Sequence, residues 1–359
     1  MLSMLSRPGL LVIRAGNRPR LEETLAFALA GIPLEAAAAG GPLPPLAGRR
    51  VLFALSVSET GLDADACALL THLRANPRCM EGAVGAMLID GEGELHTKQL
   101  AHMLALAANS AGCLFPGKPL VEATGGLHNW QVQAKRRGVS PQEAYRLAAK
   151  ELAERLWAFE PPQTQAPRVL MLHASDRATS NTLALGNAVC RLLEPACAVR
   201  ELSLQNGAVF DCRGCSYKTC SHFAAQNSCF YGGVIVKEIH PALVECDALL
   251  LLCPNYNDSV SANIMAFINR LTSLLVFNSL YDKYLFAVVV SGYSGSDLVA
   301  QQALGALCLN KTFMLPPRFC MMETANDPGS AMTAPGIDGR VAEFAQNMRR
   351  VLCGAHGAG

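Results

Sequence analysis

Four cysteines lie close together in the C-terminal half of this chain. Cys212, Cys215, Cys220 and Cys229 fall within eighteen residues. Thiolates at such short spacing commonly hold an iron–sulfur cluster or a zinc ion, and clustered cysteines also occur as structural or redox-active thiols. The spacing leaves these alternatives open. We expect Cys212, Cys215 and Cys220 to converge on one site, with Cys229 as the fourth ligand. We expect His222 to be a surface residue; it is the alternative to Cys229 as the fourth ligand.

A second group of polar residues follows the apolar run at 168–173. It contains Ser175, Arg177, Ser180, Asn181 and Thr182, at the point where a helix is expected to begin. The free N–H groups and the dipole of a helix N-terminus favour an anion, and hydroxyl and guanidinium groups can donate to phosphate oxygens. The alternative is an ordinary helix cap. The segment has neither the glycine fingerprint of dinucleotide-binding loops nor the Gly-Lys-Ser/Thr sequence of nucleotide-binding loops.

Two further polar loops follow predicted strands. The first contains Pro254, Asn255, Tyr256, Asn257 and Ser259, and the second contains Gly292 and Tyr293. The first loop offers an aromatic face and amide groups to a planar ring, and glycine in the second permits close backbone approach to a ligand. For each loop the alternative is a simple turn before a helix. In parallel sheets ligands bind beyond the carboxyl ends of the strands, so three such loops predict a site for a phosphorylated cofactor.

Alternating strands and helices would place these loops on one edge of a sheet. We expect strands over residues 168–173, 198–204, 247–253, 284–291 and 312–321. We expect helices over residues 180–193, 241–246, 261–276, 297–309 and 341–351. This alternation predicts an α/β fold with a doubly wound, parallel, five-stranded sheet.

Two Pro-rich joints, at residues 36–48 and 160–167, divide the sequence. The second marks the main boundary, between an N-terminal domain over 1–160 and a C-terminal domain over 168–359. The N-terminal domain is a less regular α/β region, with strands expected at 50–57 and 84–90 and helices at 63–73, 97–108 and 140–159. It shows no sequence repeat of the second domain, but a degenerate copy of the same architecture is compatible with this pattern. Its function stays unassigned.

Composition narrows the class of protein. The chain has 359 residues, of which 51% are hydrophobic and 16% are charged, and its net charge is +1. This predicts a globular protein with no electrostatic footprint for nucleic acid or for an acidic membrane. No apolar run reaches the roughly 18 residues of a membrane span, and no signal peptide is evident. With fourteen cysteines, we expect a cytoplasmic protein whose thiols are reduced or bound to metal.

The three loops and the cysteine pair together resemble a known family. Residues 175–182, residues 254–262 with the following 266–270, and Cys212-Arg-Gly-Cys215 are similar to the phosphate loop, flavin loop and cysteine loop of flavodoxin-like NADPH-dependent FMN reductases, in particular their iron–sulfur flavoprotein branch. The resemblance covers residues 168–321. The cysteine spacing departs from that branch, and Tyr231-Gly232-Gly233 replaces its usual acidic pair.

The resemblance implies an FMN-dependent oxidoreductase that takes hydride from NAD(P)H and passes electrons to an acceptor. Ser175, Arg177, Ser180, Asn181 and Thr182 would hold the phosphate, and the residues of the other two loops would border the isoalloxazine. The four cysteines would hold a [4Fe–4S] cluster beside the flavin. No side chain is assigned as a general acid or base, because the cofactor supplies the chemistry.

The alternative function is a non-enzymatic electron carrier or redox sensor that docks to a partner protein. A third is a scaffold that has kept the fold without the cofactor. We expect the electron acceptor to be a small molecule or a protein, and we expect the chain to form a homo-oligomer.

Overall fold

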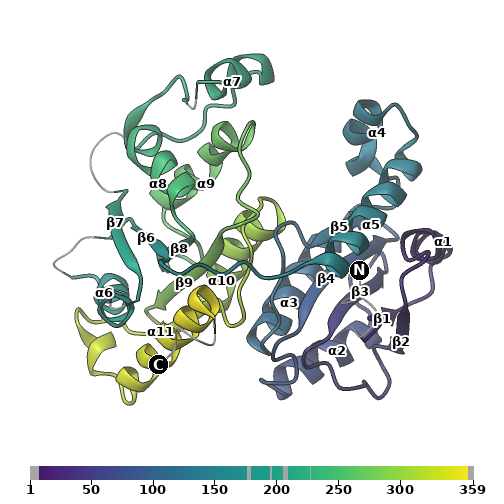
Figure 1. Cartoon of the computed structure of the whole chain (residues 1–359), viewed down its shortest axis with the longest axis horizontal. Helices are drawn as coiled ribbons and strands as arrows, with labels where there is room; N and C mark the ends of the chain where they lie inside the picture. The colour runs from purple at the N-terminus through teal and green to yellow at the C-terminus, as the bar shows by residue number, and fades with distance from the viewer. Residues whose placement is uncertain (1–7, 176–178, 195, 205–208, 227, 355–359) are drawn as a thin grey trace. The chain divides into compact units, whose positions relative to one another are not determined.

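The computed structural model describes residues 8–354, apart from residues 176–178, 195, 205–208 and 227 (Figure 1). The chain divides into two compact units, Met1–Glu160 and Pro161–Gly359. Each unit has its own parallel sheet. Within the described part of the chain, no helix combines the length and the apolar composition that a membrane crossing needs.

The C-terminal unit is built on a five-stranded parallel sheet. Its strands are β6 (Arg168–His173), β7 (Ala198–Ser203), β8 (Ala248–Pro254), β9 (Tyr284–Ser291) and β10 (Cys320–Thr324). They are paired in the order β10-β9-β8-β6-β7. The inner strands β8 and β9 are buried along almost their whole length, as expected for apolar strands covered on both faces.

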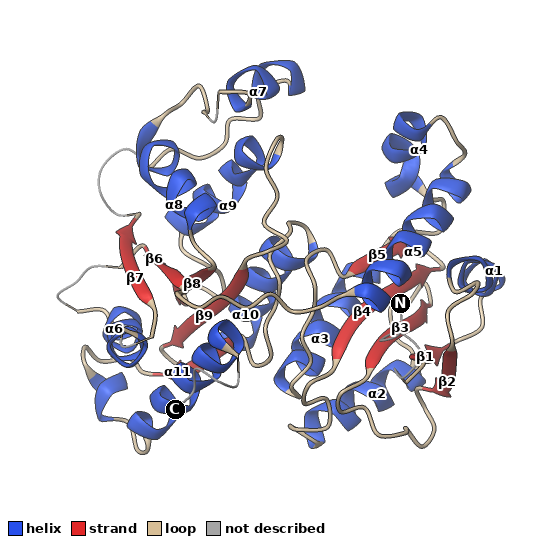
Figure 2. Cartoon of the chain, in the orientation of Figure 1, coloured by secondary structure: helices blue, strands red, loops and turns tan. Residues whose placement is uncertain are grey.

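Helices cover both faces of this sheet (Figure 2). They are α6 (Asn181–Leu193), α7 (Tyr217–Ala224), α8 (His240–Glu245), α9 (Ala262–Leu275), α10 (Ser296–Leu304) and α11 (Ile337–Cys353). Helix α6 packs against α11, while α10 contacts β9 and β10. The predicted α/β class and doubly wound flavodoxin-like sheet are therefore confirmed.

The fifth strand was predicted in the wrong place. We expected it over residues 312–321, but β10 begins at Cys320. Pro316 and Pro317 interrupt the earlier segment, and proline has no N–H to donate to a ladder of hydrogen bonds. The loop that follows β10 therefore begins later in the chain than the sequence pattern indicates, and it reaches the same edge as the other strand ends.

The N-terminal unit has the same strand order. Its strands are β1 (Leu10–Ala15), β2 (Leu34–Ala38), β3 (Arg50–Val57), β4 (Val84–Gly91) and β5 (Leu120–Ala123). Its helices are α1 (Pro19–Ala28), α2 (Ala64–Ala75), α3 (Thr97–Ser110), α4 (Gln131–Arg137) and α5 (Pro141–Ala158). The order β2-β1-β3-β4-β5 and the order of the C-terminal sheet are identical when each is numbered from its own first strand. The architecture is thus repeated without a repeat in sequence.

A buried ion-pair group occupies the carboxyl edge of the N-terminal sheet. Asp90, at the end of β4, is fully buried. Arg20 Nε donates to Asp90 Oδ2 at 2.7 Å, and Arg18 Nε donates to Asp90 Oδ1 at 2.9 Å. Arg20 also donates to the carbonyl oxygens of Gly91, Thr124 and Gly125. These contacts join the chain after β1 to the ends of β4 and β5.

We predict that Asp90→Asn destabilises the N-terminal unit by about 3 kcal/mol, because it removes the buried carboxylate that pairs with two partly buried guanidinium groups, although Arg18 also lies 3.9 Å from the exposed Glu92. Both tryptophans, Trp130 and Trp157, lie in this unit, so urea unfolding followed by tryptophan fluorescence reports on it selectively. Glu35→Gln is the matched control, because Glu35 pairs with Arg49 at a half-exposed position and its loss should cost less than about 1 kcal/mol. Equal shifts for the two variants would contradict the prediction.

Candidate functional site

A cleft of about 470 Å³ lies at the carboxyl edge of the C-terminal sheet. This volume is within the range of cofactor sites. The cleft is lined by Ser175, Thr179, Ser180, Asn181, Thr182, Pro254, Asn255, Tyr256, Asn257, Val290, Gly292, Tyr293, Ala325 and Asn326. The structure thus brings together the loops after β6, β8 and β9. Of the residues expected there, Arg177 lies outside the described residues and Ser259 does not line the cleft.

The loop after β6 presents an unused hydroxyl to this cleft. Ser175 is 3% exposed, and its Oγ has no hydrogen-bond partner among the described residues. Its backbone N–H donates to Nδ1 of the buried His173 at 3.3 Å, which fixes the start of the loop. Ser180 caps α6 by accepting from the N–H of Leu183 at 3.1 Å. Its hydroxyl proton stays available, so both serines can donate to an anion at this helix N-terminus.

Asn181 has a structural part in the cleft. Its Nδ2 donates to the carbonyl oxygen of Asp327 at 2.8 Å, and its Oδ1 accepts from the N–H of Ala331 at 3.2 Å. The side chain therefore joins α6 to the loop after β10. With its amide committed on both sides, Asn181 is placed to position the loop rather than to donate to a phosphate from its side chain.

The loop after β8 is a tight turn. Asn257 and Asp258 both have positive φ, 53° and 57°, a conformation that Asn and Asp tolerate better than most residues. Tyr256 and Ser259 pair across the turn by backbone hydrogen bonds. Gln302 of α10 holds the turn from the other side, since its Nε2 donates to the carbonyl oxygen of Asp258 at 2.9 Å. Ser259 is thus part of the turn itself.

Asn255 ties this turn to the loop after β9. Its Nδ2 donates to Ser291 Oγ and to the carbonyl oxygen of Ser294, both at 2.9 Å. Its Oδ1 is buried and has no partner among the described residues. A Cβ on Gly292 would lie 3.1 Å from Asn326 Oδ1, so glycine keeps this wall open. Tyr256 and Tyr293 are exposed at the rim, where their rings are available to a planar ligand.

Sequence reasoning missed one wall of the cleft. Ala325 and Asn326 follow β10, and the misplaced fifth strand hid them. Thr179 lies in the segment 175–182 that resembles the phosphate loop but was not named as a site residue, and Val290 was expected only as part of a strand. Pro316 and Pro317 were a signal that the fifth strand begins after them. With the strand placed there, Ala325 and Asn326 follow its carboxyl end, which is where parallel sheets bind ligands.

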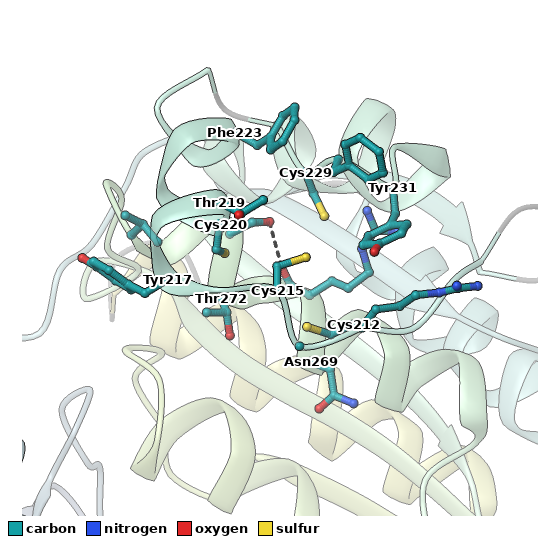
Figure 3. A pocket seen from close by; sticks show the side chains of 16 residues that line it. Cys212, Cys215, Tyr217, Thr219, Cys220, Phe223, Cys229, Tyr231, Asn269 and Thr272 are labelled. Carbon is teal, nitrogen blue, oxygen red and sulfur yellow. Dashed lines mark hydrogen bonds between the residues drawn. The ribbon is translucent and has the colours of Figure 1, made fainter.

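The four cysteines surround a different cavity, of about 330 Å³ (Figure 3). We call it the cysteine pocket; it is lined by Cys212, Arg213, Gly214, Cys215, Tyr217, Thr219, Cys220, Phe223, Cys229, Phe230, Tyr231, Asn269, Arg270, Thr272, Ser273 and Val276. No residue lines both this pocket and the cleft. Asn269 lies seven residues after the first residue of α9, or about 10 Å along the helix. The cysteine pocket and the cleft are thus lined by different described residues, and the expectation that the cysteines lie beside the flavin stays a prediction.

Helix α9 anchors both ends of the cysteine segment. Arg270 is 2% exposed, and it donates to the carbonyl oxygen of Gly232 at 2.8 Å and to that of Phe210 at 3.4 Å. Asn269 Nδ2 donates to Asp211 Oδ1 at 2.9 Å. The segment from Phe210 to Gly232 is thus closed into a loop on α9, with α7 at its centre. Figure 3 shows all four cysteine side chains on this one cavity.

The thiols lie near one another but are not arranged as a metal site. Cys212 and Cys215 are exposed, whereas Cys220 and Cys229 are partly buried. Desolvation raises the pKa of the Cys220 thiol, and the neighbouring thiols of Cys229, Cys212 and Cys215 raise it further. Among the described residues, no group of three or more His, Cys, Asp or Glu side chains has an arrangement that could hold a metal ion. The expected cluster therefore has no support from this geometry.

Comparisons with known proteins agree with the fold of the C-terminal unit. Residues 167–327 match the family model described as NADPH-dependent FMN reductase. A comparison with curated proteins finds no match.

Among solved structures, an NAD(P)H:quinone oxidoreductase from Methanothermobacter marburgensis is 15% identical, with a TM-score of 0.40 over 51% of this chain and 96% of that chain. An azoreductase from Bacillus anthracis is 15% identical, with a TM-score of 0.38 over 50% of this chain and 96% of that chain. A putative quinone reductase from Klebsiella pneumoniae is 16% identical, with a TM-score of 0.37 over 52% and 85%. The family match is the specific finding: residues 167–327, the core of the C-terminal unit, are similar to the NADPH-dependent FMN reductase family and have a flavodoxin-like strand order.

Proposed function

We propose that this protein is an FMN-dependent oxidoreductase that takes hydride from NAD(P)H and reduces a small-molecule acceptor. The observation that carries the proposal is the cleft at the carboxyl edge of the C-terminal sheet, which combines a helix N-terminus with unpartnered polar atoms. The family match supports the same cofactor. FMN supplies the hydride-transfer chemistry when bound, so the protein has to bind and orient it.

The residues of the cleft fit such a group. Ser175 Oγ, a buried hydroxyl without a partner among the described residues, costs free energy in the apo protein unless a ligand accepts its proton. Ser180 and the first N–H groups of α6 lie beside it and favour a phosphate. Thr182 is the further hydroxyl at this helix start. Arg177 would add positive charge, on the resemblance alone.

The other end of the cleft fits a planar, partly polar ring. Asn255 Oδ1 is a buried acceptor without a partner among the described residues, and it can receive a proton from a ring N–H. Pro254, Asn257 and Gly292 form close backbone walls, and Tyr256 and Tyr293 add aromatic faces at the rim. These residues orient the ring and leave one side open to a nicotinamide or an acceptor.

The proposal stops at the flavin. Electron transfer from the flavin to a [4Fe–4S] cluster has one supporting observation, the four cysteines around one pocket. Among the described residues, no three side chains are arranged to hold a metal ion. Analysis of iron and labile sulfide in the purified protein tests for the cluster. The electron-carrier alternative predicts bound FMN without NAD(P)H oxidation. The homo-oligomeric state and the cytoplasmic location stay predictions from the sequence.

We expect the purified protein to bind one FMN per chain and to oxidise NADPH or NADH when a quinone or an azo dye is supplied. Heat-released cofactor should be FMN and not FAD, because the cleft offers one helix N-terminus for one phosphate. Stripped protein titrated with FMN, followed by flavin fluorescence, measures the binding. Stripped protein that remains folded and takes up no FMN would refute the proposal.

Ser175→Ala should weaken FMN binding about fivefold, which corresponds to about 1 kcal/mol for one hydrogen bond. It should not lower the unfolding midpoint of the apo protein, because it removes a buried hydroxyl that has no hydrogen-bond partner among the described residues. Ser273→Ala is the matched control: its Oγ donates to the carbonyl oxygen of Arg270 at 3.0 Å, away from the cleft. That variant should lose about 1 kcal/mol of stability and keep its FMN affinity. If Ser175→Ala keeps its FMN affinity and Ser273→Ala loses it, the assignment of Ser175 to the phosphate site is wrong.

A further inference from the structure

We propose that the cysteine pocket is a reversible dithiol–disulfide centre that reduces small anionic disulfides, with Cys215 as the attacking thiol. The pocket is a second site, separate from the cleft, and this inference does not depend on FMN binding. Three groups of observations carry it: the placement of the thiols, the surroundings of Cys215, and the charge of the walls.

The thiols are held where they can react with one another. All four line one cavity of about 330 Å³, although Cys212 and Cys215 precede α7, Cys220 lies in it and Cys229 follows it. Arg270 and Asn269 fix the two ends of the segment on α9. Gly214 has a φ of +66° and open space where a Cβ would be, so the chain between Cys212 and Cys215 can change direction without a clash. Figure 3 shows the Cys215 and Cys229 side chains on opposite walls of the cavity.

Cys215 is the thiol best placed to attack. It is exposed, and it directly precedes Ser216, the residue that caps α7 by accepting from the N–H of Thr219 at 3.2 Å. The positive end of a helix dipole stabilises a nearby thiolate. Cys215 also lies near Tyr231 in the lining of the pocket. The Tyr231 hydroxyl can thus donate to the Cys215 sulfur.

The walls of the pocket favour a ligand with negative charge. Two guanidinium groups line it, those of Arg213 and Arg270, and no Asp or Glu does. The Arg213 guanidinium lies 5.5 Å from the centre of the Tyr231 ring. Arg270 Nε is buried and has no partner among the described residues. The rest of the lining combines aromatic side chains and Val276 with the polar Thr219, Asn269, Thr272 and Ser273, which suits an organic disulfide that carries both a carbon chain and polar groups.

The reaction proceeds in two balanced steps. The Cys215 thiolate attacks one sulfur of the substrate, forms a mixed disulfide and releases the first substrate thiolate. A second cysteine of the pocket, as its thiolate, then attacks Cys215 Sγ and releases the other half. Two electrons pass from the protein dithiol to the substrate disulfide, and two substrate thiols leave after taking up protons. Excess low-molecular-mass thiol reverses both steps.

The test uses the full-length, fully reduced protein and two disulfides of opposite charge. Glutathione disulfide is anionic and cystamine is cationic. We expect glutathione disulfide to convert the pocket to an internal disulfide that includes Cys215, seen by thiol alkylation and peptide mass mapping. Cys215→Ser should abolish that internal disulfide and keep its FMN content. Cys67→Ser, which removes an exposed thiol of the N-terminal unit, should change nothing.

The charge argument has its own control. Arg213→Gln should lower the ratio of the glutathione disulfide rate to the cystamine rate about fivefold, the scale of one lost charge contact in electrostatic steering. Arg191→Gln, at an exposed position of α6, should leave the ratio unchanged. An unchanged ratio in Arg213→Gln would overturn the assignment of anionic substrates.

Three results would overturn the dithiol centre itself. One is glutathione that stays attached to Cys215 without internal transfer. Another is an internal disulfide formed equally well in Cys215→Ser. The third is anaerobically purified protein whose four thiols resist alkylation until iron or zinc is removed, because that result would assign the pocket to a metal.

Discussion

The pairing of β6 with β7 on one side and β8 on the other is the constraint on which the cleft depends. The chain leaves β6 for one edge of the sheet and later returns to β8 on its other side. Because the crossovers are right-handed, the connection that follows β6 and the connection that follows β8 run over opposite faces of the sheet. The two connections separate at the carboxyl ends of these strands, and this is where a parallel sheet binds its ligands. The loops after β6 and β8 border this space. The register that aligns His173 with Leu252, and Pro254 with Val290, brings their ends level.

Two amides turn that topological gap into a defined cleft. Asn255 bonds the loop after β8 to the loop after β9, and Asn181 bonds α6 to the loop after β10. Each amide connects segments that are far apart in the sequence. Both polar atoms of Asn181 and the Nδ2 of Asn255 are hydrogen-bonded inside the protein, whereas Ser175 Oγ and Asn255 Oδ1 are buried without a partner among the described residues. A rigid frame with a few unused polar atoms is the usual form of a cofactor site.

The N-terminal unit has the same strand order but different side chains at the carboxyl edge of its sheet. It has the same order of five parallel strands, but its carboxyl edge is occupied by Asp90 and the two arginines that follow β1. Arg20 donates to Asp90 and to three carbonyl oxygens, so its guanidinium joins the strand ends that a cofactor would otherwise contact. One architecture thus carries different side chains at the carboxyl edges of its two sheets, with internal ion pairs and hydrogen bonds at the ends of β4 and β5 in the N-terminal unit.

The sequence by itself determined the fold class and most regular elements of the C-terminal unit, but not α7 or the position of β10. Long apolar runs such as Ala248–Pro254 and Tyr284–Ser291, separated by amphipathic helices, have few other arrangements. Residue type and position after a strand also pointed to Ser175, Asn255 and Gly292, because the carboxyl edge is a property of any parallel sheet. Only the tertiary structure decided which polar atoms at the cleft lack a hydrogen-bond partner. The Asn181 side-chain amide is hydrogen-bonded to the backbone of Asp327 and Ala331, whereas Ser175 Oγ has no partner among the described residues. It also separated the cysteine pocket from the cleft, because Arg270 anchors the cysteine segment about two helical turns along α9. Local patterns fix which elements form, but contacts between distant segments fix where loop side chains point, and those contacts leave no periodic signal in the sequence.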